Sequence, residues 1–96
     1  MSEEIISPSE LEEELRKCPE WEIKGSKIIR ELEFEEFMDA IDFVNLIAEA
    51  AEDASHHPDI DIRYNKVKLA LTTHEIGGVT EADLEMAIRI DNICDE

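Results

Sequence analysis

The chain has 96 residues, of which 43% are hydrophobic and 36% charged. We expect one domain over residues 1–96, because chains of about 100 residues rarely divide into two cores. The net charge of −17 disfavours direct binding of DNA, RNA or a membrane surface, since phosphates and anionic lipids would be repelled.

The first predicted element is a short helix. Ser7–Glu10 is typical of a helix start, with a serine cap, a proline at the first helical position and a glutamate that can reach back to the cap. The helix should run to about Lys17 and stop at Pro19. Its apolar residues are Leu11 and Leu15, so we expect it to pack lightly at an edge.

A hairpin follows, from Trp21–Lys24 and Lys27–Phe34 around a turn at Gly25-Ser26. Trp21 is interpreted as a core or edge anchor, because a lone tryptophan is more often structural than a ligand platform.

A long helix is predicted from Glu35 to about Ala54, where the apolar period becomes helical. Phe43 and Leu46 lie off the main apolar stripe and predict a second contact surface, such as a subunit interface. The stripe itself comprises Phe37, Ala40, Ile41, Val44, Ile47, Ala48 and Ala51.

A second hairpin and a last helix complete the chain. Asp59–Arg63 alternates between charged and apolar residues, Asn65-Lys66 is a plausible turn, and Tyr64 is interpreted as core. Thr80 with Asp83 is a capping pair for the helix. The buried side of this helix should comprise Leu84, Ala87, Ile88 and Ile93.

The predicted element order is therefore α-β-β-α-β-β-α. Hairpins imply antiparallel pairing, so we expect an α+β fold with a four-stranded antiparallel sheet and three helices packed on one face.

The cysteines and the N-terminus suggest a cytoplasmic protein. Cys18 and Cys94 have no paired spacing and are interpreted as reduced thiols. The sequence starts without a secretion signal, and its longest uncharged run is too short to span a bilayer.

All three histidines lie at the ends of predicted elements, and histidine exchanges protons near neutrality. His56 and His57 follow the long helix, and His74 follows the last strand. A turn at Asn65-Lys66 would place His57 across from His74. Glu52 precedes His56 by one helical turn and could orient its imidazole.

Other chemistries fit the sequence less well. Adjacent histidines on an extended segment point to opposite faces, and no H-x-H or H-x-x-x-H pair exists, so we expect no metal site. The chain also lacks a glycine-rich phosphate loop and a nucleophile motif.

The histidines belong to a longer spaced pattern. It comprises Glu52, the run His56-His57-Pro58, Tyr64-Asn65-Lys66-Val67, Thr73-His74-Glu75 and Asp83. From about Trp21 to the last helix, the chain thereby resembles the pterin-4a-carbinolamine dehydratase family.

The resemblance implies a hydro-lyase that needs no cofactor. The family dehydrates 4a-hydroxytetrahydropterin, left by aromatic amino acid hydroxylases, to quinonoid dihydropterin during tetrahydrobiopterin recycling. By analogy, His56 and His74 would be acid and base, His57 would mainly hold the pterin, and Glu52 would support the cluster. The expected substrate-binding residues are His56, His57, Pro58, Thr73, His74, Glu75 and Ile76.

The resemblance also leaves a binding role open. Some family members are dimerisation cofactors of a transcription factor, and dehydratase-like proteins without the active-site residues are assembly chaperones. The histidine trio favours the enzyme, since a scaffold does not need it. We expect a homodimer or homotetramer formed through the long helix.

Overall fold

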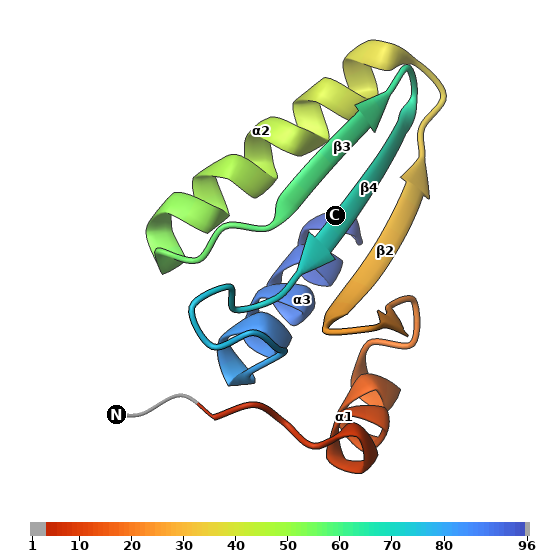
Figure 1. The fold of residues 1–96 in the computed structure, drawn as a ribbon. Helices are drawn as coiled ribbons and strands as arrows, with labels where there is room; N and C mark the ends of the chain where they lie inside the picture. The colour runs from red at the N-terminus through yellow and green to blue at the C-terminus, as the bar shows by residue number, and fades with distance from the viewer. Residues whose placement is uncertain (1–3, 96) are drawn as a thin grey trace.

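The computed structural model describes residues 4–95, which form three α-helices, a short 3-10 helix and one four-stranded sheet (Figure 1). The predicted α+β class and element order are confirmed. In chain order, the elements are α1 (Pro8–Glu14), η1 (Leu15–Lys17), β1 (Glu22–Lys24), β2 (Lys27–Glu33), α2 (Phe37–Ala54), β3 (Asp59–Arg63), β4 (Lys66–Leu71) and α3 (Glu81–Cys94).

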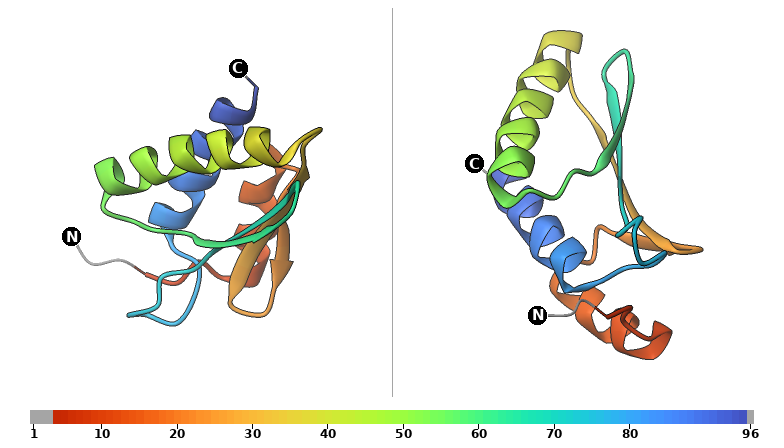
Figure 2. Two further views of the ribbon diagram at one scale, coloured as in Figure 1. Left: turned by 90° about the horizontal axis from the view of Figure 1, so that it is seen from above. Right: turned by 60° about the vertical axis from the view of Figure 1, so that its left-hand side comes forward.

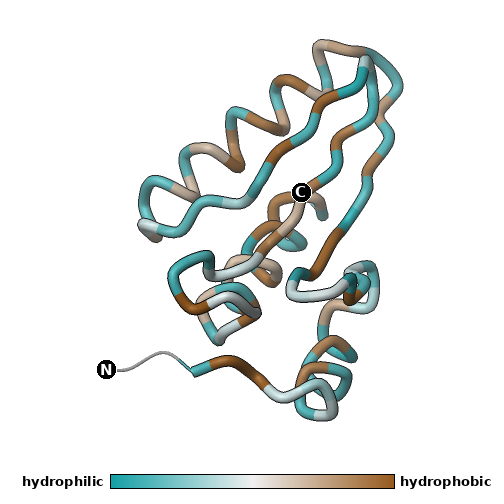
Figure 3. Tube along the Cα trace, viewed as in Figure 1, coloured by the Kyte–Doolittle hydropathy of each residue, from teal (hydrophilic) through white to brown (hydrophobic). Residues whose placement is uncertain are grey.

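The sheet is antiparallel, with the strand order β1-β2-β4-β3. Helices α2 and α3 lie on the same side of the sheet, and α1 lies at one end of the molecule (Figure 2). Polar and apolar residues alternate over the first part of β4, from Lys66 to Leu69, and the strand ends in the buried apolar residues Ala70 and Leu71 (Figure 3). A nine-residue loop joins β4 to α3, and the start of α3 lies close to the end of α2, where His56 contacts Asp83.

The register of the second hairpin differs from the sequence prediction. Residues 64 and 65 form the turn, and Asp59 pairs with Ala70. Continuing this register places His57 opposite Thr72, so the predicted pairing of His57 with His74 is wrong. The turn lies one residue earlier than predicted, and each such step moves the opposing position by two.

Asn65 fixes the turn against the end of β2. Its side-chain amide donates to the Phe34 carbonyl oxygen at 2.7 Å, and the Phe34 N–H donates to the Asn65 carbonyl oxygen at 2.8 Å. Tyr64 takes a left-handed backbone with φ of 54°, and its side chain is 70% exposed. Its predicted place in the core is therefore wrong, because the turn directs the side chain into solvent.

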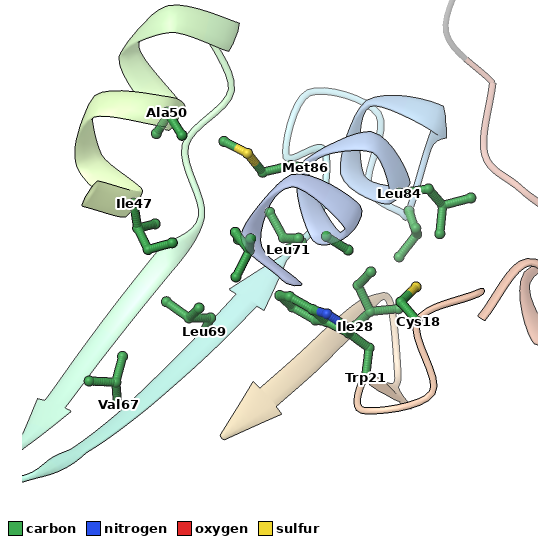
Figure 4. Packing of buried hydrophobic residues seen from close by; sticks show 14 of the residues in the cluster. Cys18, Trp21, Ile28, Ile47, Ala50, Val67, Leu69, Leu71, Leu84 and Met86 are labelled. Carbon is green, nitrogen blue, oxygen red and sulfur yellow. The ribbon is translucent and has the colours of Figure 1, made fainter. Parts of the chain in front are cut away.

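The core lies between the sheet and the two long helices. Figure 4 shows Val67, Leu69 and Leu71 of β4 in one cluster with Ile47 of α2 and Met86 of α3. Side chains from both long helices therefore share a single apolar layer with the central strand.

The buried faces of α2 and α3 are rotated from the predicted ones. Phe43 is buried and its ring centroid lies 5.1 Å from that of Phe34, whereas Phe37 is exposed. In α3, Ile88 is exposed and Ile90 is buried instead. Apolar periodicity gave each helix correctly but misplaced the centre of its buried stripe.

The N-terminal helix is anchored more firmly than predicted, because Leu11 and Leu15 both join the core. Its Ser7 cap is confirmed by the hydrogen bond that Ser7 Oγ accepts from the Glu10 N–H. Trp21 is also buried, and its indole N–H donates to Asp91 at 2.8 Å. No helix within residues 4–95 has the length and hydropathy that a bilayer crossing requires.

Candidate active site

The end of α2 presents two of the three histidines. Ser55 takes a left-handed backbone with φ of 54°, and the His56 N–H closes the helix by donating to the Ala51 carbonyl oxygen at 3.1 Å. The chain then leaves the helix through the buried Pro58. This reversal separates the two imidazoles, which contact different carboxylates.

His56 contacts a buried carboxylate. Its Nε2 lies against Oδ1 of Asp83, whose side chain is fully buried. The second oxygen of Asp83 accepts from the Thr73 hydroxyl and from the Thr80 N–H, both at 2.9 Å. The Thr73 and Thr80 hydroxyls lie 2.8 Å apart. One carboxylate therefore joins the end of α2, the end of β4 and the start of α3.

This contact determines what the His56 ring can offer to a ligand. A carboxylate only accepts hydrogen bonds, so the Nε2 of His56 holds its proton toward Asp83. The Nδ1 atom then remains for exchange with a ligand. Such an imidazole is fixed in both tautomer and orientation.

The sequence identified Asp83 as the capping partner of Thr80, and that pairing is confirmed. Its contact with His56 was missed. The sequence pattern shared with the family includes Asp83 and could have indicated a role in the site. The burial of Asp83 and the direction of its side chain, however, depend on how α3 packs.

His57 has a separate and exposed partner. Its Nε2 lies 2.5 Å from Oε2 of Glu52, and both side chains are mostly solvent-exposed. The predicted pairing of Glu52 with His56 is wrong. Helix α2 ends at Ala54, so His56 does not continue the helical face that carries Glu52.

His74 lies beside the start of β3. Its Nε2 is 3.7 Å from Oδ1 of Asp59, two residues after His57, and both side chains are exposed. The segments around residues 57 and 74 are therefore neighbours. Within residues 4–95, no hydrogen bond joins two imidazoles directly.

The other residues predicted to bind substrate lie in the loop after β4. Thr73 is buried, and its N–H donates to the Gly78 carbonyl oxygen at 2.9 Å. Glu75 is exposed at the loop tip, and Ile76 is half-buried. A backbone hydrogen bond between Thr73 and Gly78 thus closes the loop, and the residues between them include the exposed Glu75.

A cavity of about 140 Å³ adjoins His56 between the end of α2 and the first turns of α3. Its lining residues are Ala54, His56, Ala82, Glu85, Met86 and Arg89.

The three histidines offer groups that are chemically able to transfer protons. His56, His57 and His74 each face a different carboxylate, so each can exchange a proton while its charged form is balanced. Among residues 4–95, no three His, Cys, Asp or Glu side chains form a group that could hold a metal ion.

Comparison with known proteins gives consistent matches to one family. The family model described as pterin 4 alpha carbinolamine dehydratase matches residues 4–93. A protein of Acidobacterium capsulatum is 50% identical over 86 residues, covering 90% of this chain and 94% of the relative. A protein of Chloroflexus aurantiacus is 49% identical over 88 residues, covering 92% and 95%. Both carry provisional names as pterin-4-alpha-carbinolamine dehydratases.

Two solved structures have similar folds. The transcriptional coactivator/pterin dehydratase of Brucella melitensis matches with a TM-score of 0.88 and 36% identity, covering 94% of this chain and 98% of that one. A pterin dehydratase-like protein described as a RuBisCO assembly factor in the alpha-carboxysome matches with a TM-score of 0.62 and 22% identity, covering 76% and 84%. The second likeness concerns the fold alone.

Proposed function

Because the chain belongs to the pterin 4 alpha carbinolamine dehydratase family, we propose that it dehydrates 4a-hydroxytetrahydropterin to quinonoid dihydropterin. The protein would act as a hydro-lyase in tetrahydrobiopterin recycling. The single observation that carries this proposal is the contact of His56 with the fully buried Asp83. A buried carboxylate is unfavourable unless it is well paired, and here it orients an imidazole at the edge of a cavity.

The reaction needs two proton movements. One group protonates the 4a-hydroxyl as the C4a–O bond breaks and water leaves, and another takes the proton from N5. We assign these two roles to His56 and His74. Their chain segments lie close together, because His74 contacts Asp59, which follows His56 by three residues. Positioned acid–base groups of this kind contribute about 10²–10⁴-fold to rates.

The remaining predicted residues hold the pterin. His57, oriented by Glu52, contacts the ring system from the α2 side. Pro58 and the loop residues Thr73, Glu75 and Ile76 complete the binding surface. In this scheme Glu52 supports the histidine cluster through His57 rather than through His56.

The test is an assay of quinonoid dihydropterin formation with and without the protein. The double variant His56→Ala, His74→Ala should lose about 10²-fold or more of the catalysed rate. The variant Lys24→Ala, on the distant strand β1, is the matched control and should keep it. Equal rates for the double variant and the parent would refute the enzyme hypothesis, provided that circular dichroism shows both to be folded.

A second candidate function is a non-catalytic role as a dimerisation cofactor or assembly scaffold, in a chain that itself forms a homodimer or homotetramer. Helix α2 exposes Phe37, Met38 and Leu46, and the edge strand β3 exposes Ile60 and Ile62. These apolar side chains suit a second copy of the chain, because a shared surface would remove them from water. A scaffold function would use the same surface without needing the histidines.

A further inference from the structure

The loop between β4 and α3 is folded around the backbone of Thr73. The Thr73 carbonyl oxygen accepts from the N–H groups of Ile76 at 3.0 Å and Gly77 at 2.8 Å, and the Thr73 N–H donates to the Gly78 carbonyl oxygen at 2.9 Å. His74 lies within this set of hydrogen bonds, and its side chain is exposed. The backbone bonds therefore determine where the chain around His74 runs.

The imidazole of His74 has little support of its own. Its Nε2 lies 3.7 Å from Oδ1 of Asp59, beyond ordinary hydrogen-bond distance, and this is the one polar contact found for the ring within residues 4–95. His56, in contrast, is held by the buried carboxylate of Asp83. The direction in which the His74 ring points therefore depends on the backbone of its loop.

A segment from the N-terminal end of the chain packs against the far side of this loop. Residues 4–7, which we call the N-terminal strap, run past the loop into α1 (Figure 1). The Ile6 N–H donates to the Val79 carbonyl oxygen at 2.9 Å, and the Ile5 side chain lies against Gly78. A Cβ atom at position 78 would lie 2.9 Å from Cγ2 of Ile5, closer than real Cβ atoms come. The glycine thus permits a contact that a larger residue would prevent.

The strap is fixed at its other end by α1. Ser7 caps this helix, and Leu11 anchors it in the core. Ile6 packs partly buried against the same core, whereas Ile5 is 52% exposed and lies outside it. Ile5 is therefore held against the loop from a firm base, although burial in the core does not account for its position.

Resting on the proposed dehydratase function, we propose that Ile5 is a positioning residue that acts through His74. Its side chain packs against Gly78 and holds the loop in the conformation that the Thr73 hydrogen bonds close. Without this packing, the loop and the imidazole that it carries would move relative to the substrate. Since a small misplacement of a catalytic group lowers the rate, dehydration should depend on a side chain that transfers no proton.

The first test measures kcat in single variants. Ile5→Ala removes the Cγ1, Cγ2 and Cδ1 atoms that lie against Gly78. It should lower kcat by about three- to tenfold, within the ~10²-fold that a misplacement of about 1 Å can cost. Ile5→Val keeps Cγ1 and Cγ2 and should recover most of the rate. Gly78→Ala should act as Ile5→Ala does, because its Cβ would displace Ile5. Ile23→Ala, an exposed isoleucine on β1, is the matched control.

Combined variants separate positioning from a general structural role. In a His74→Ala protein, Ile5→Ala should cause no further loss of kcat, because no imidazole remains to be positioned. In a His56→Ala protein, the loss caused by Ile5→Ala should persist. An equal factor of loss in both backgrounds would overturn the inference, and so would an Ile5→Ala protein with the parental kcat.

Amide hydrogen exchange tests the loop without the reaction. The N–H groups of Ile76 and Gly77 are hydrogen-bonded in the closed loop. They should exchange about three- to tenfold faster in Ile5→Ala than in the parent or in Ile23→Ala, because the loop opens more often. If the parent formed no quinonoid dihydropterin, the proposed function would fail, and this measurement would decide by itself whether Ile5 holds the loop. Exchange rates that do not change in Ile5→Ala would refute that role.

Discussion

At the scale of single residues, the most informative side chain is Asp83. It is fully buried, and each carboxylate oxygen is engaged, one by His56 and the other by Thr73 and Thr80. The sequence predicted a helix cap here, and the structure adds an imidazole to the same carboxylate. A residue with both duties links the stability of α3 to the orientation of His56.

Because Asp83 both caps α3 and contacts His56, we expect Asp83→Asn to affect stability and activity together. The amide cannot accept from all three donors, and a buried donor left without a partner costs about 1–3 kcal/mol. Urea unfolding should show a loss of that size, and the dehydration rate should fall as well. The control Asp53→Asn alters an exposed ion pair and should change stability by less than about 1 kcal/mol. An Asp83→Asn protein with parental stability and rate would show that this hydrogen-bond network contributes neither to folding nor to catalysis.

The two cysteines lead to a pH prediction. Burial, as the largest cause, raises the pKa of the Cys18 and Cys94 thiols above their ordinary value of 9.0. The folded state therefore holds these protons more tightly than the unfolded chain does. Their contribution to stability is complete below about pH 9 and is lost as the pH rises through the raised values.

The free energy of unfolding should consequently fall more steeply above pH 9 in the parent than in a Cys18→Ala, Cys94→Ala variant. Urea titrations at neutral and alkaline pH measure the difference, and the variant controls for lysine and tyrosine ionisation. Parallel curves for the two proteins would contradict it. The same raised pKa values predict slow alkylation of both thiols in the folded protein at neutral pH.

At the scale of elements, the sequence was sufficient for the class and order of helices and strands, because turns, caps and apolar periods are local signals. It was insufficient for the register of β3 against β4, since Tyr64 can enter either the strand or the turn. It was also insufficient for the buried face of α2, where Phe43 packs against Phe34, a residue outside the helix.

The candidate site followed the same division. The sequence named all three histidines, which are recognisable by type and position. Their partners could not be assigned, because the pairs His56–Asp83 and His74–Asp59 depend on how distant elements pack. Glu52 was assigned to the wrong histidine, since the left-handed Ser55 ends the helix first.

The turn of the second hairpin can be tested directly. Asn65→Ala removes the amide that donates to the Phe34 carbonyl oxygen, and we expect a loss of about 0.5–1.5 kcal/mol in urea unfolding. The neighbouring Tyr64→Gly is the control, because glycine adopts the left-handed backbone readily and the tyrosine side chain is exposed. A neutral Asn65→Ala would show that the register is fixed by the strands alone.

At the scale of the whole molecule, charge and exposed apolar area act in opposite directions. The net charge of −17 keeps copies apart, whereas exposed side chains such as Leu46 and Ile60 favour their association. Association should therefore strengthen with added salt, which screens the repulsion.

Light scattering should accordingly give the mass of a dimer or tetramer. Leu46→Lys should shift the protein toward the monomer, because an interface over the exposed side of α2 would bury the new ammonium group. The variant Ile23→Lys, also exposed but on β1, controls for the loss of an apolar side chain elsewhere. A strict monomer at high concentration and high salt would refute the proposed assembly.

The three-way junction at Asp83 also has a dynamic consequence. Fraying of the end of α2 breaks the contact with His56, and fraying of the start of α3 breaks the one with Thr80. Both helix ends are thus expected to open to amide hydrogen exchange as one cooperative unit. The His56 imidazole should therefore keep its orientation for as long as this unit stays folded. A ligand would then meet a ring that is already oriented before binding.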